Sequence, residues 1–313
     1  MLPRFKAGIL VTKKHIRSEK TTTVTGLSVL LFANLGWGLC DVLIAYVSRG
    51  QFTTWFHALT GTILLLAILL FQGKKFSLSE FKSAFPLGLQ RAAVWTVLFY
   101  AFQEDNPTIA ITILSFSSVL AIIIFSKYLN EKPTLIIYMS ALFGTVGVIL
   151  ASLKSLDSFV LTTGAILSLI ILPVSSAGPF IVRKVQNKVP ADKSAFYMYV
   201  WVSIIITFTL PFAKITYSLT TKEIWIFALM ALVGAGGHLL YNLSQKQTSF
   251  IVNIIVSNIH IPATAILSYI LIDKSLNMHQ IVGIVIIVAV VAFVSIKQHE
   301  RKPKEPLDLP IDI

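Results

Sequence analysis

Residues 24–47 read VTGLSVLLFANLGWGLCDVLIAYV, an apolar run in which Asp41 is the one charged residue. A helix crosses the roughly 30 Å hydrocarbon core of a bilayer with about 20 such residues. The whole chain has the same character, because 55% of its 313 residues are hydrophobic, 13% are charged and the mean hydropathy is +0.79. Average soluble domains contain roughly 25% charged residues. The composition therefore indicates an integral membrane protein.

Apolar runs of similar length recur along the chain, and we predict ten membrane-spanning helices from them. The runs are continuously apolar and do not alternate in polarity as barrel strands do, so the predicted fold class is all-α integral membrane. Pro173 and Pro179 are expected to kink the sixth span. The ten predicted spans are Val24–Val47, Phe52–Phe71, Ala84–Phe102, Thr108–Tyr128, Thr134–Leu153, Phe159–Val182, Ala195–Phe212, Ile224–Leu243, Phe250–Ile272 and Met278–Ile296.

The formal net charge is +12, and the basic residues that produce it are distributed unevenly between the two sides of the predicted membrane. With the N-terminus inside, twenty Lys and Arg residues fall in inner segments and five in outer loops. This bias predicts a multi-pass protein of the cytoplasmic (inner) membrane with both termini cytoplasmic, and it explains the positive charge without a nucleic-acid partner. Residues 1–23 are expected to form an uncleaved basic tail that either lies on anionic lipid or is disordered.

The two halves of the chain resemble each other. An offset of 142 residues aligns Ser115 with Ser257 and Lys132 with Lys274. Five spans in each half would insert the second half upside down relative to the first, and such inverted repeats are typical of secondary transporters. The predicted divisions are an N-terminal tail (1–23), a first five-helix repeat (24–153), a second five-helix repeat (154–296) and a C-terminal tail (297–313).

Two segments carry a resemblance to a known family. They are LNEKPTLIIYMSALFGTVGVIL, Leu129 to Leu150, and GGHLLYNLSQKQTSFIVNIIVSNIHIPATAILSYILIDKSLNMHQIVGIVII, Gly236 to Ile287. In both, an apolar helix is followed by a short acidic turn and a glycine-bearing helix. The chain resembles the drug/metabolite transporter superfamily, in its ten-helix EamA-like branch. It departs from the family pattern at Leu120, where the repeat would place the counterpart of Pro262, and at Asp273, where glutamate is more frequent. The resemblance implies transport by alternating access and does not identify the cargo.

Two charged residues, Asp41 and Arg91, lie well away from the ends of the predicted spans. Charges near the bilayer centre are costly, so they usually face a cavity or a partner. Arg91 and Asp41 could clamp the carboxylate and ammonium of a zwitterion, or they could neutralise each other during the transport cycle. Alternatively, Asp41 could pair with Arg49 or water near the outer interface, and Arg91 could extend toward the inner headgroups.

Further polar and aromatic residues are candidates for binding a substrate. Trp95 and Phe99 follow Arg91 at intervals of four, so the three share one helical face, which could stack a planar or cationic group. Each histidine could instead serve helix packing, a role that the sequence favours most for His57 and His238. Cys40, the single cysteine, is expected to pack inertly. The complete predicted substrate-binding set is Arg91, Asp41, Trp95, Phe99, His260, Asn34, Trp37 and His238.

These features predict a secondary transporter of a small polar or zwitterionic organic metabolite, such as an amino acid. A nucleoside-bearing cargo such as S-adenosylmethionine is the alternative, and a channel or a membrane enzyme would be a protein of another class. The sequence contains no P-loop and no H-E-x-x-H or G-x-S-x-G motif, so we expect no nucleotide hydrolysis, no enzymatic activity, no cofactor and no metal. Energy would come from a substrate gradient or from protons, with Asp41 or a histidine as the carrier.

Overall fold

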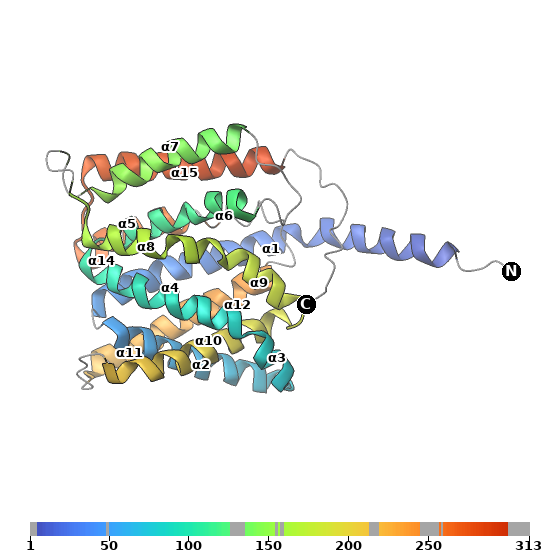
Figure 1. The fold of residues 1–313 in the computed structure, drawn as a ribbon. Helices are drawn as coiled ribbons and strands as arrows, with labels where there is room; N and C mark the ends of the chain where they lie inside the picture. Colours follow the sequence, from blue (N-terminus) through green and yellow to red (C-terminus); the bar gives the residue numbers. More distant parts are fainter. Residues whose placement is uncertain are drawn as a thin grey trace.

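The structure is a computed structural model that describes residues 5–47, 50–125, 135–153, 156, 160–212, 219–244, 257 and 259–299. Within these ranges the regular elements are helices that lie side by side, and the one β-type contact is an isolated bridge between Leu153 and Leu161 (Figure 1). The predicted all-α fold class is therefore confirmed for the described part of the chain.

The helices of the first half follow the predicted spans closely, with one division. The span predicted for 108–128 breaks at Phe116 into two helices. The first of these begins with an Asn106 cap, whose side chain accepts a hydrogen bond from the Thr108 amide, followed by Pro107 at the first helical position. The helices are α1 (Phe5–Val47), α2 (Gly50–Phe71), α3 (Leu78–Ser83), α4 (Phe85–Glu104), α5 (Pro107–Ser115), α6 (Ser117–Phe125) and α7 (Leu135–Ser152).

The second half contains two further divisions, and the first of them falls in the span for which the two prolines predict a kink. The predicted sixth span breaks at Ala177, between Pro173 and Pro179, and the eighth is interrupted by a π-helical turn. The elements are α8 (Thr163–Ser176), α9 (Gly178–Gln186), α10 (Ala191–Thr209), η1 (Leu210–Phe212), α11 (Thr221–Met230), η2 (Ala231–Ala235), α12 (Gly236–Ser244), α14 (His260–Ile272) and α15 (Met278–His299).

In the part of the chain that the structure describes, four helical segments are long and apolar enough to cross a membrane. They are Thr25–Val47, Gly50–Phe71, Thr163–Gln186 and Thr221–Ser244, and shorter apolar helices cover Tyr138–Ser152, His260–Ile272 and Met278–Val290. The count of ten spans stays a prediction, because 126–134 and 245–256 lie outside the described residues.

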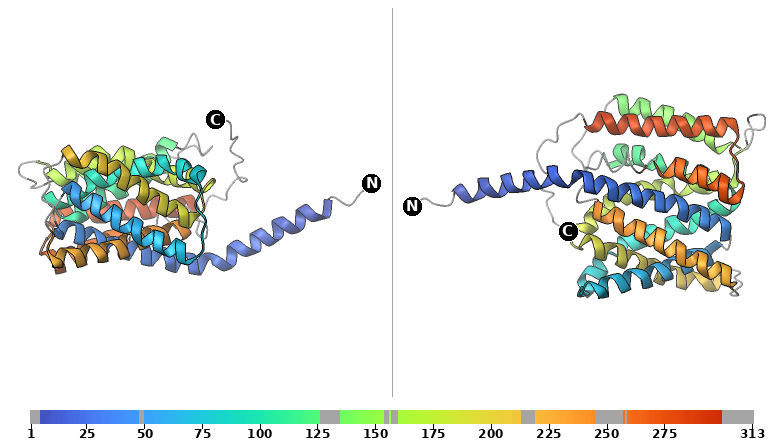
Figure 2. Two further views of the ribbon diagram at one scale, coloured as in Figure 1. Left: turned by 90° about the horizontal axis from the view of Figure 1, so that it is seen from below. Right: turned by 180° about the vertical axis from the view of Figure 1, so that it is seen from behind.

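The N-terminal segment is continuous with the first span, because α1 begins at Phe5 and runs without interruption to Val47. Figure 2 shows this extension projecting beyond the other helices.

The helices of the two halves pair in a reciprocal pattern. The contact of α4 with α8 has its counterpart in the contact of α12 with α1, while α2 packs against α10 and α7 packs against α15. The last pair is in close backbone contact, since a Cβ added to Gly283 would lie 2.6 Å from the Gly147 carbonyl oxygen. Both halves therefore contribute to the middle of the bundle.

One end of the bundle, which we call the α3 end, is joined by charged side chains. It lies on the same side as the N-terminal extension (Figure 1). Lys193 at the start of α10 pairs with Glu80 of α3 at 2.8 Å, and Lys74 pairs with Asp192 at 3.0 Å. Trp201 stacks on Phe81 with ring centroids 4.3 Å apart.

The opposite end, which we call the α11 end, is joined mainly by neutral groups. Trp55 of α2 donates its indole N–H to Thr207 of α10 at 2.8 Å, and Gln51 donates to Thr209. Lys274, which follows α14, donates to the Asp105 carbonyl at 2.5 Å, just beyond the C-terminus of α4.

The acidic turn named in the sequence lies at the α11 end. Asp273 ends α14 in the left-handed conformation, with φ at 52°, a region that Asp and Asn enter more readily than other non-glycine residues. The following Lys274 thereby reaches α4. The equivalent turn of the first half, at Glu131 and Lys132, lies outside the described residues.

Candidate functional site

A cavity of about 220 Å³ lies among the helices. All eight residues of the predicted substrate-binding set line it. Their placement on one cavity supports the physical argument used to choose them, that charges within apolar spans face a shared space. The lining residues with polar or aromatic side chains are Asn34, Trp37, Cys40, Asp41, His57, Arg91, Trp95, Phe99, Ser115, Ser117, Ser175, His238, Tyr241, Ser257 and His260.

Asp41 is paired with a histidine. Its Oδ2 lies 2.5 Å from Nε2 of His260, and 11% and 15% of the two side chains are exposed. The sequence had suggested two arginines as partners of Asp41. Arg91 is not within ion-pair distance of Asp41, and Arg49 lies outside the described residues. The carboxylate and the imidazole form a paired acid and base on the cavity wall.

The close crossing of α1 and α14 positions this pair. A Cβ on Gly38 would lie 3.1 Å from the Ala263 Cβ and 3.2 Å from the Thr264 nitrogen, so a small residue here brings α1 against the first turn of α14. His260 is the first residue of α14, and Pro262 therefore lies in the first turn. A proline there removes no helical hydrogen bond.

Arg91 and two neighbouring groups direct unsatisfied polar atoms into the site. Among the residues that the structure describes, the buried Nε of Arg91, Nε1 of Trp37 and Oδ1 of Asn34 have no hydrogen-bond partner. No carboxylate of the described residues lies within 4 Å of the Arg91 guanidinium. Buried polar groups are normally satisfied, so two donors and one acceptor left over at one cavity suit a polar ligand.

Aromatic rings form a continuous wall of the cavity. The ring centroid of His238 lies 4.7 Å from that of Trp37 and 5.3 Å from that of Trp95. Trp95 stacks on Phe99 at 6.2 Å with an interplanar angle of 17°, as their spacing on one helical face predicts. Tyr241 approaches Trp37 to 5.0 Å. The rings present π-faces that can hold a cation or a planar group.

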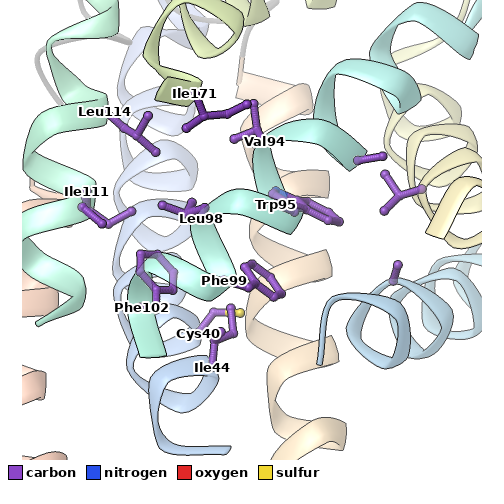
Figure 3. Close-up of a cluster of buried hydrophobic side chains, with 14 of the residues drawn as sticks. Cys40, Ile44, Val94, Trp95, Leu98, Phe99, Phe102, Ile111, Leu114 and Ile171 are labelled. Carbon is purple, nitrogen blue, oxygen red and sulfur yellow. The ribbon is translucent and has the colours of Figure 1, made fainter. Parts of the chain in front are cut away.

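Aliphatic residues close the other side. Figure 3 shows Val94 and Leu98 of α4 turned toward Ile111 and Leu114 of α5, while Trp95 and Phe99 point away from that group. These four aliphatic residues also line the cavity. The cavity is therefore polar and aromatic on the side of α1, α12 and α14, and mainly apolar toward α5, whose last residue, Ser115, adds one hydroxyl group.

Glycines in the π-helical turn and at the start of α12 let the aromatic wall assemble. A Cβ on Gly234 would lie 2.5 Å from Cε1 of His57 and 2.8 Å from Sγ of Cys40. A Cβ on Gly237 would lie 2.8 Å from Nε1 of Trp37. The π-turn is a feature that often occurs at functional sites, and here only glycine leaves room for the ring atoms.

Sequence reasoning missed several lining residues. His57 donates to or accepts from the Tyr199 hydroxyl at 3.2 Å and lines the cavity, although the sequence favours a structural role for it. Cys40 and Tyr241 also line it. A signal existed for one pair, because the repeat offset aligns Ser115 with Ser257 and both reach the cavity. In the described part of the chain, no group of three or more His, Cys, Asp or Glu residues is arranged to hold a metal ion.

The architecture defines the class first: a multi-pass helical membrane protein with a central polar cavity between two halves. The model of the EamA-like transporter family matches this sequence twice, over residues 24–153 and 162–296. The chain belongs to the EamA-like transporter family, which confirms the resemblance found in the sequence, and it is a membrane transporter of small molecules.

Other comparisons add only the fold. No curated protein matches the chain. One solved structure, entitled "Crystal structure of protein", is 13% identical and aligns with a TM-score of 0.60 over 90% of this chain and 98% of its own length. This similarity extends to the arrangement of helices and not to the cargo.

Proposed function

We propose that the chain is a secondary transporter of a small zwitterionic metabolite, an amino acid or a close relative. The observation that carries this proposal is the buried Nε of Arg91, which lies at the cavity without a partner among the described residues, while a carboxylate, Asp41, lines the same cavity. A guanidinium without a carboxylate partner is suited to bind one from the cargo. Asp41, together with the faces of Trp37 and Tyr241, is suited to receive an ammonium group.

The size of the cavity favours a small cargo. Its volume of about 220 Å³ is below the roughly 300–1,000 Å³ typical of sites for drug-sized ligands. A nucleoside-bearing cation such as S-adenosylmethionine would use the aromatic wall but needs more room. The amino-acid class is therefore the first candidate, and the nucleoside-bearing class is the second.

The reciprocal packing of the two halves supports alternating access. Helices α2 and α10, and likewise α5 and α14, join one half to the other beside the cavity. Five predicted spans per half would make these halves inverted repeats, which can exchange conformations around a central site. The distribution of basic residues supports an inner-membrane orientation with both termini cytoplasmic. A gradient would supply the energy, since the sequence has no P-loop.

Ligand-induced thermal stabilisation of the purified protein tests this proposal. The panel contains the twenty amino acids, S-adenosylmethionine and a set of nucleosides. A ligand at 100 times its dissociation constant stabilises the folded state by about 2.7 kcal/mol. We expect stabilisation by at least one amino acid, lost in Arg91→Ala and retained in Lys222→Ala, a control that removes a cation paired with Tyr46 and away from the cavity. Stabilisation by nucleoside compounds alone would favour the second class, and no difference between the variants would remove Arg91 from the site.

A further inference from the structure

The polar groups of the cavity lie at two levels along the helices. On α1, Asn34, Trp37 and Asp41 follow one another at intervals of three and four residues, so they share one helical face. At about 1.5 Å per residue, Asp41 lies about 10 Å further along the helix than Asn34. All three residues line the cavity, which therefore offers an amide at one level and a carboxylate two turns away.

Helices α1 and α4 run in the same direction along the cavity, from the α3 end to the α11 end (Figure 1). The start of α4 directly follows α3. Just beyond the other end of α1, a Cβ added to Gly50 would lie 2.8 Å from the ring of Tyr100, near the end of α4. Positions on the two helices can therefore be compared by level.

Aromatic rings separate the level of Arg91 from that of Asp41. The ring centroid of His238 lies 4.7 Å from that of Trp37 on α1 and 5.3 Å from that of Trp95 on α4. Arg91 precedes Trp95 by one turn, and Asp41 follows Trp37 by one turn. The two charged residues are thus attached on opposite sides of these rings, with about 12 Å of helix between their levels.

The level of Asn34 and Arg91 holds the two groups that the backbone of an amino acid needs. Nδ2 of Asn34 donates to the Leu30 carbonyl at 2.7 Å, so Oδ1 is the buried acceptor without a partner among the described residues. Nε of Arg91 is a buried donor without one. The ammonium nitrogen and the carboxylate carbon of an amino acid are two bonds apart, about 2.5 Å, so one level can hold both. Asp41 is then left for another cation.

We propose that the cargo is an amino acid of the lysine type, whose side chain ends in an ammonium group that binds Asp41. The inference rests on the proposed function, because Arg91 still binds the α-carboxylate, and it assigns the α-ammonium group to Oδ1 of Asn34. His260 contacts Oδ2 of Asp41. A carboxylate has about four acceptor positions, so this contact leaves room for a second donor.

The side chain of lysine fits the distance between the two levels. An extended chain advances about 1.2 Å per bond, one third of its length per residue, so the five bonds from Cα to the terminal nitrogen cover about 6 Å. A charge-assisted hydrogen bond of about 2.8 Å extends this reach to about 9 Å. The methylene stem would lie against Trp37, Trp95 and Leu98, which line the cavity. Among the described residues that line the cavity, Asp41 is the one carboxylate, so the terminal ammonium has one anionic partner.

A series of ligands that differ only in the side chain tests the inference on the purified wild-type protein. Norleucine is lysine with a hydrogen atom in place of the terminal ammonium group, and ornithine is lysine shortened by one carbon. Dissociation constants are measured by isothermal titration calorimetry. We expect lysine to bind at least tenfold more tightly than norleucine, because norleucine loses a charge-assisted hydrogen bond, and ornithine to lie between them.

A variant of the carboxylate locates the preference. Asp41→Asn should lower the affinity for lysine at least tenfold and leave that for norleucine unchanged, and norleucine binding also shows that the variant is folded. The matched control is Asp105→Asn, the same exchange at an aspartate that accepts a hydrogen bond from the Gly164 amide at 2.9 Å, outside the cavity. This control should keep the preference for lysine.

Two results would overturn the lysine-type cargo and leave the proposed function intact. The first is equal or tighter binding of norleucine, or of another amino acid without a side-chain cation, in the wild-type protein. The second is a preference for lysine that survives in Asp41→Asn. Absence of binding by every amino acid of the panel would overturn the proposed function and this inference together.

Discussion

The α3 end and the α11 end of the bundle join the same two halves of the chain with different chemistry. At the α3 end, Lys74 and Glu80 of the first half pair with Asp192 and Lys193 of the second. At the α11 end, indole, amide and hydroxyl groups connect α2 to α10, and the cation of Lys274 is held by backbone carbonyls.

This difference bears on how such a transporter opens. The proposed alternating access requires one end to separate while the other stays closed. Ion pairs respond to salt and to changes of charge, whereas neutral hydrogen bonds respond to neither. The two ends can therefore be weakened independently, and a shift in their balance should change which side of the cavity is open.

The largest effect should come from reversing one charge at the α3 end. Lys193→Glu places two carboxylates together where the partners are now 13% and 19% exposed. Since exposed pairs contribute up to about 1 kcal/mol and broken buried pairs cost about 3–5, we expect a loss near 2 kcal/mol, measured as a lower melting temperature. The double exchange Glu80→Lys with Lys193→Glu should restore most of it. Failure of the double variant to recover would mean that the pair does not join the halves.

A smaller effect should follow from Lys274→Met at the α11 end. The variant keeps an apolar stem and loses the bonds from Nζ to the Phe102 and Asp105 carbonyls at the C-terminus of α4. A cation at a helix C-terminus contributes about 0.3–1 kcal/mol at low ionic strength, so we expect destabilisation of about 1 kcal/mol in low salt and less in high salt, which screens this interaction. Lys75→Met, at an exposed lysine, is the control. Equal melting temperatures for the two variants would contradict the role of Lys274.

The smallest effect should be that of pH on the α3 end. Burial opposes ionisation of Asp192, but hydrogen bonds from Lys74 and from the Lys193 backbone outweigh it and hold the pKa of Asp192 below its ordinary value. The hydrogen bond to Glu80 raises the pKa of Lys193. The lowered pKa of Asp192 means that its carboxylate stabilises the fold above about pH 4, and this contribution is lost as the pH falls further. The raised pKa of Lys193 means that its ammonium group stabilises the fold below about pH 10, and this contribution is lost as the pH rises further.

The contribution of the α3 end should therefore be constant from about pH 5 to pH 9. The loss caused by Lys193→Glu, taken as the difference in melting temperature from wild type, should be the same at pH 6 and pH 8. A change in that difference between these two values would show that another titrating group takes part in the α3 end.

Much of this molecule could be predicted from its sequence because a bilayer imposes a simple rule. Apolar runs of about 20 residues become helices, and the rare charges within them turn toward a cavity. That rule predicted the helices α1, α2 and α4, and it also predicted that Asp41 and Arg91 face a cavity, which both residues line in the structure.

The rest depends on contacts between segments far apart in the chain. The partner of Asp41 is 219 positions away, at His260, and nothing local indicates it. The break at Phe116 involves no proline or glycine, and His57 reaches the cavity only because Gly234 leaves space for its ring. The periodicity of one helix does not predict contacts of this kind between distant segments.

The central claim is that Arg91 binds the carboxylate of the cargo, and the most direct test is counterflow of one amino acid and of its methyl ester, which lacks that carboxylate. The amino acid used is the one exchanged fastest by the wild-type protein. We predict that the wild-type protein exchanges the free acid at least tenfold faster than the ester, because the ester loses a charge-assisted hydrogen bond of about 1.5–3 kcal/mol. In Arg91→Ala, the exchange rate of the free acid should fall to that of the ester. Equal rates for acid and ester in wild type, or a preference that survives in Arg91→Ala, would contradict it.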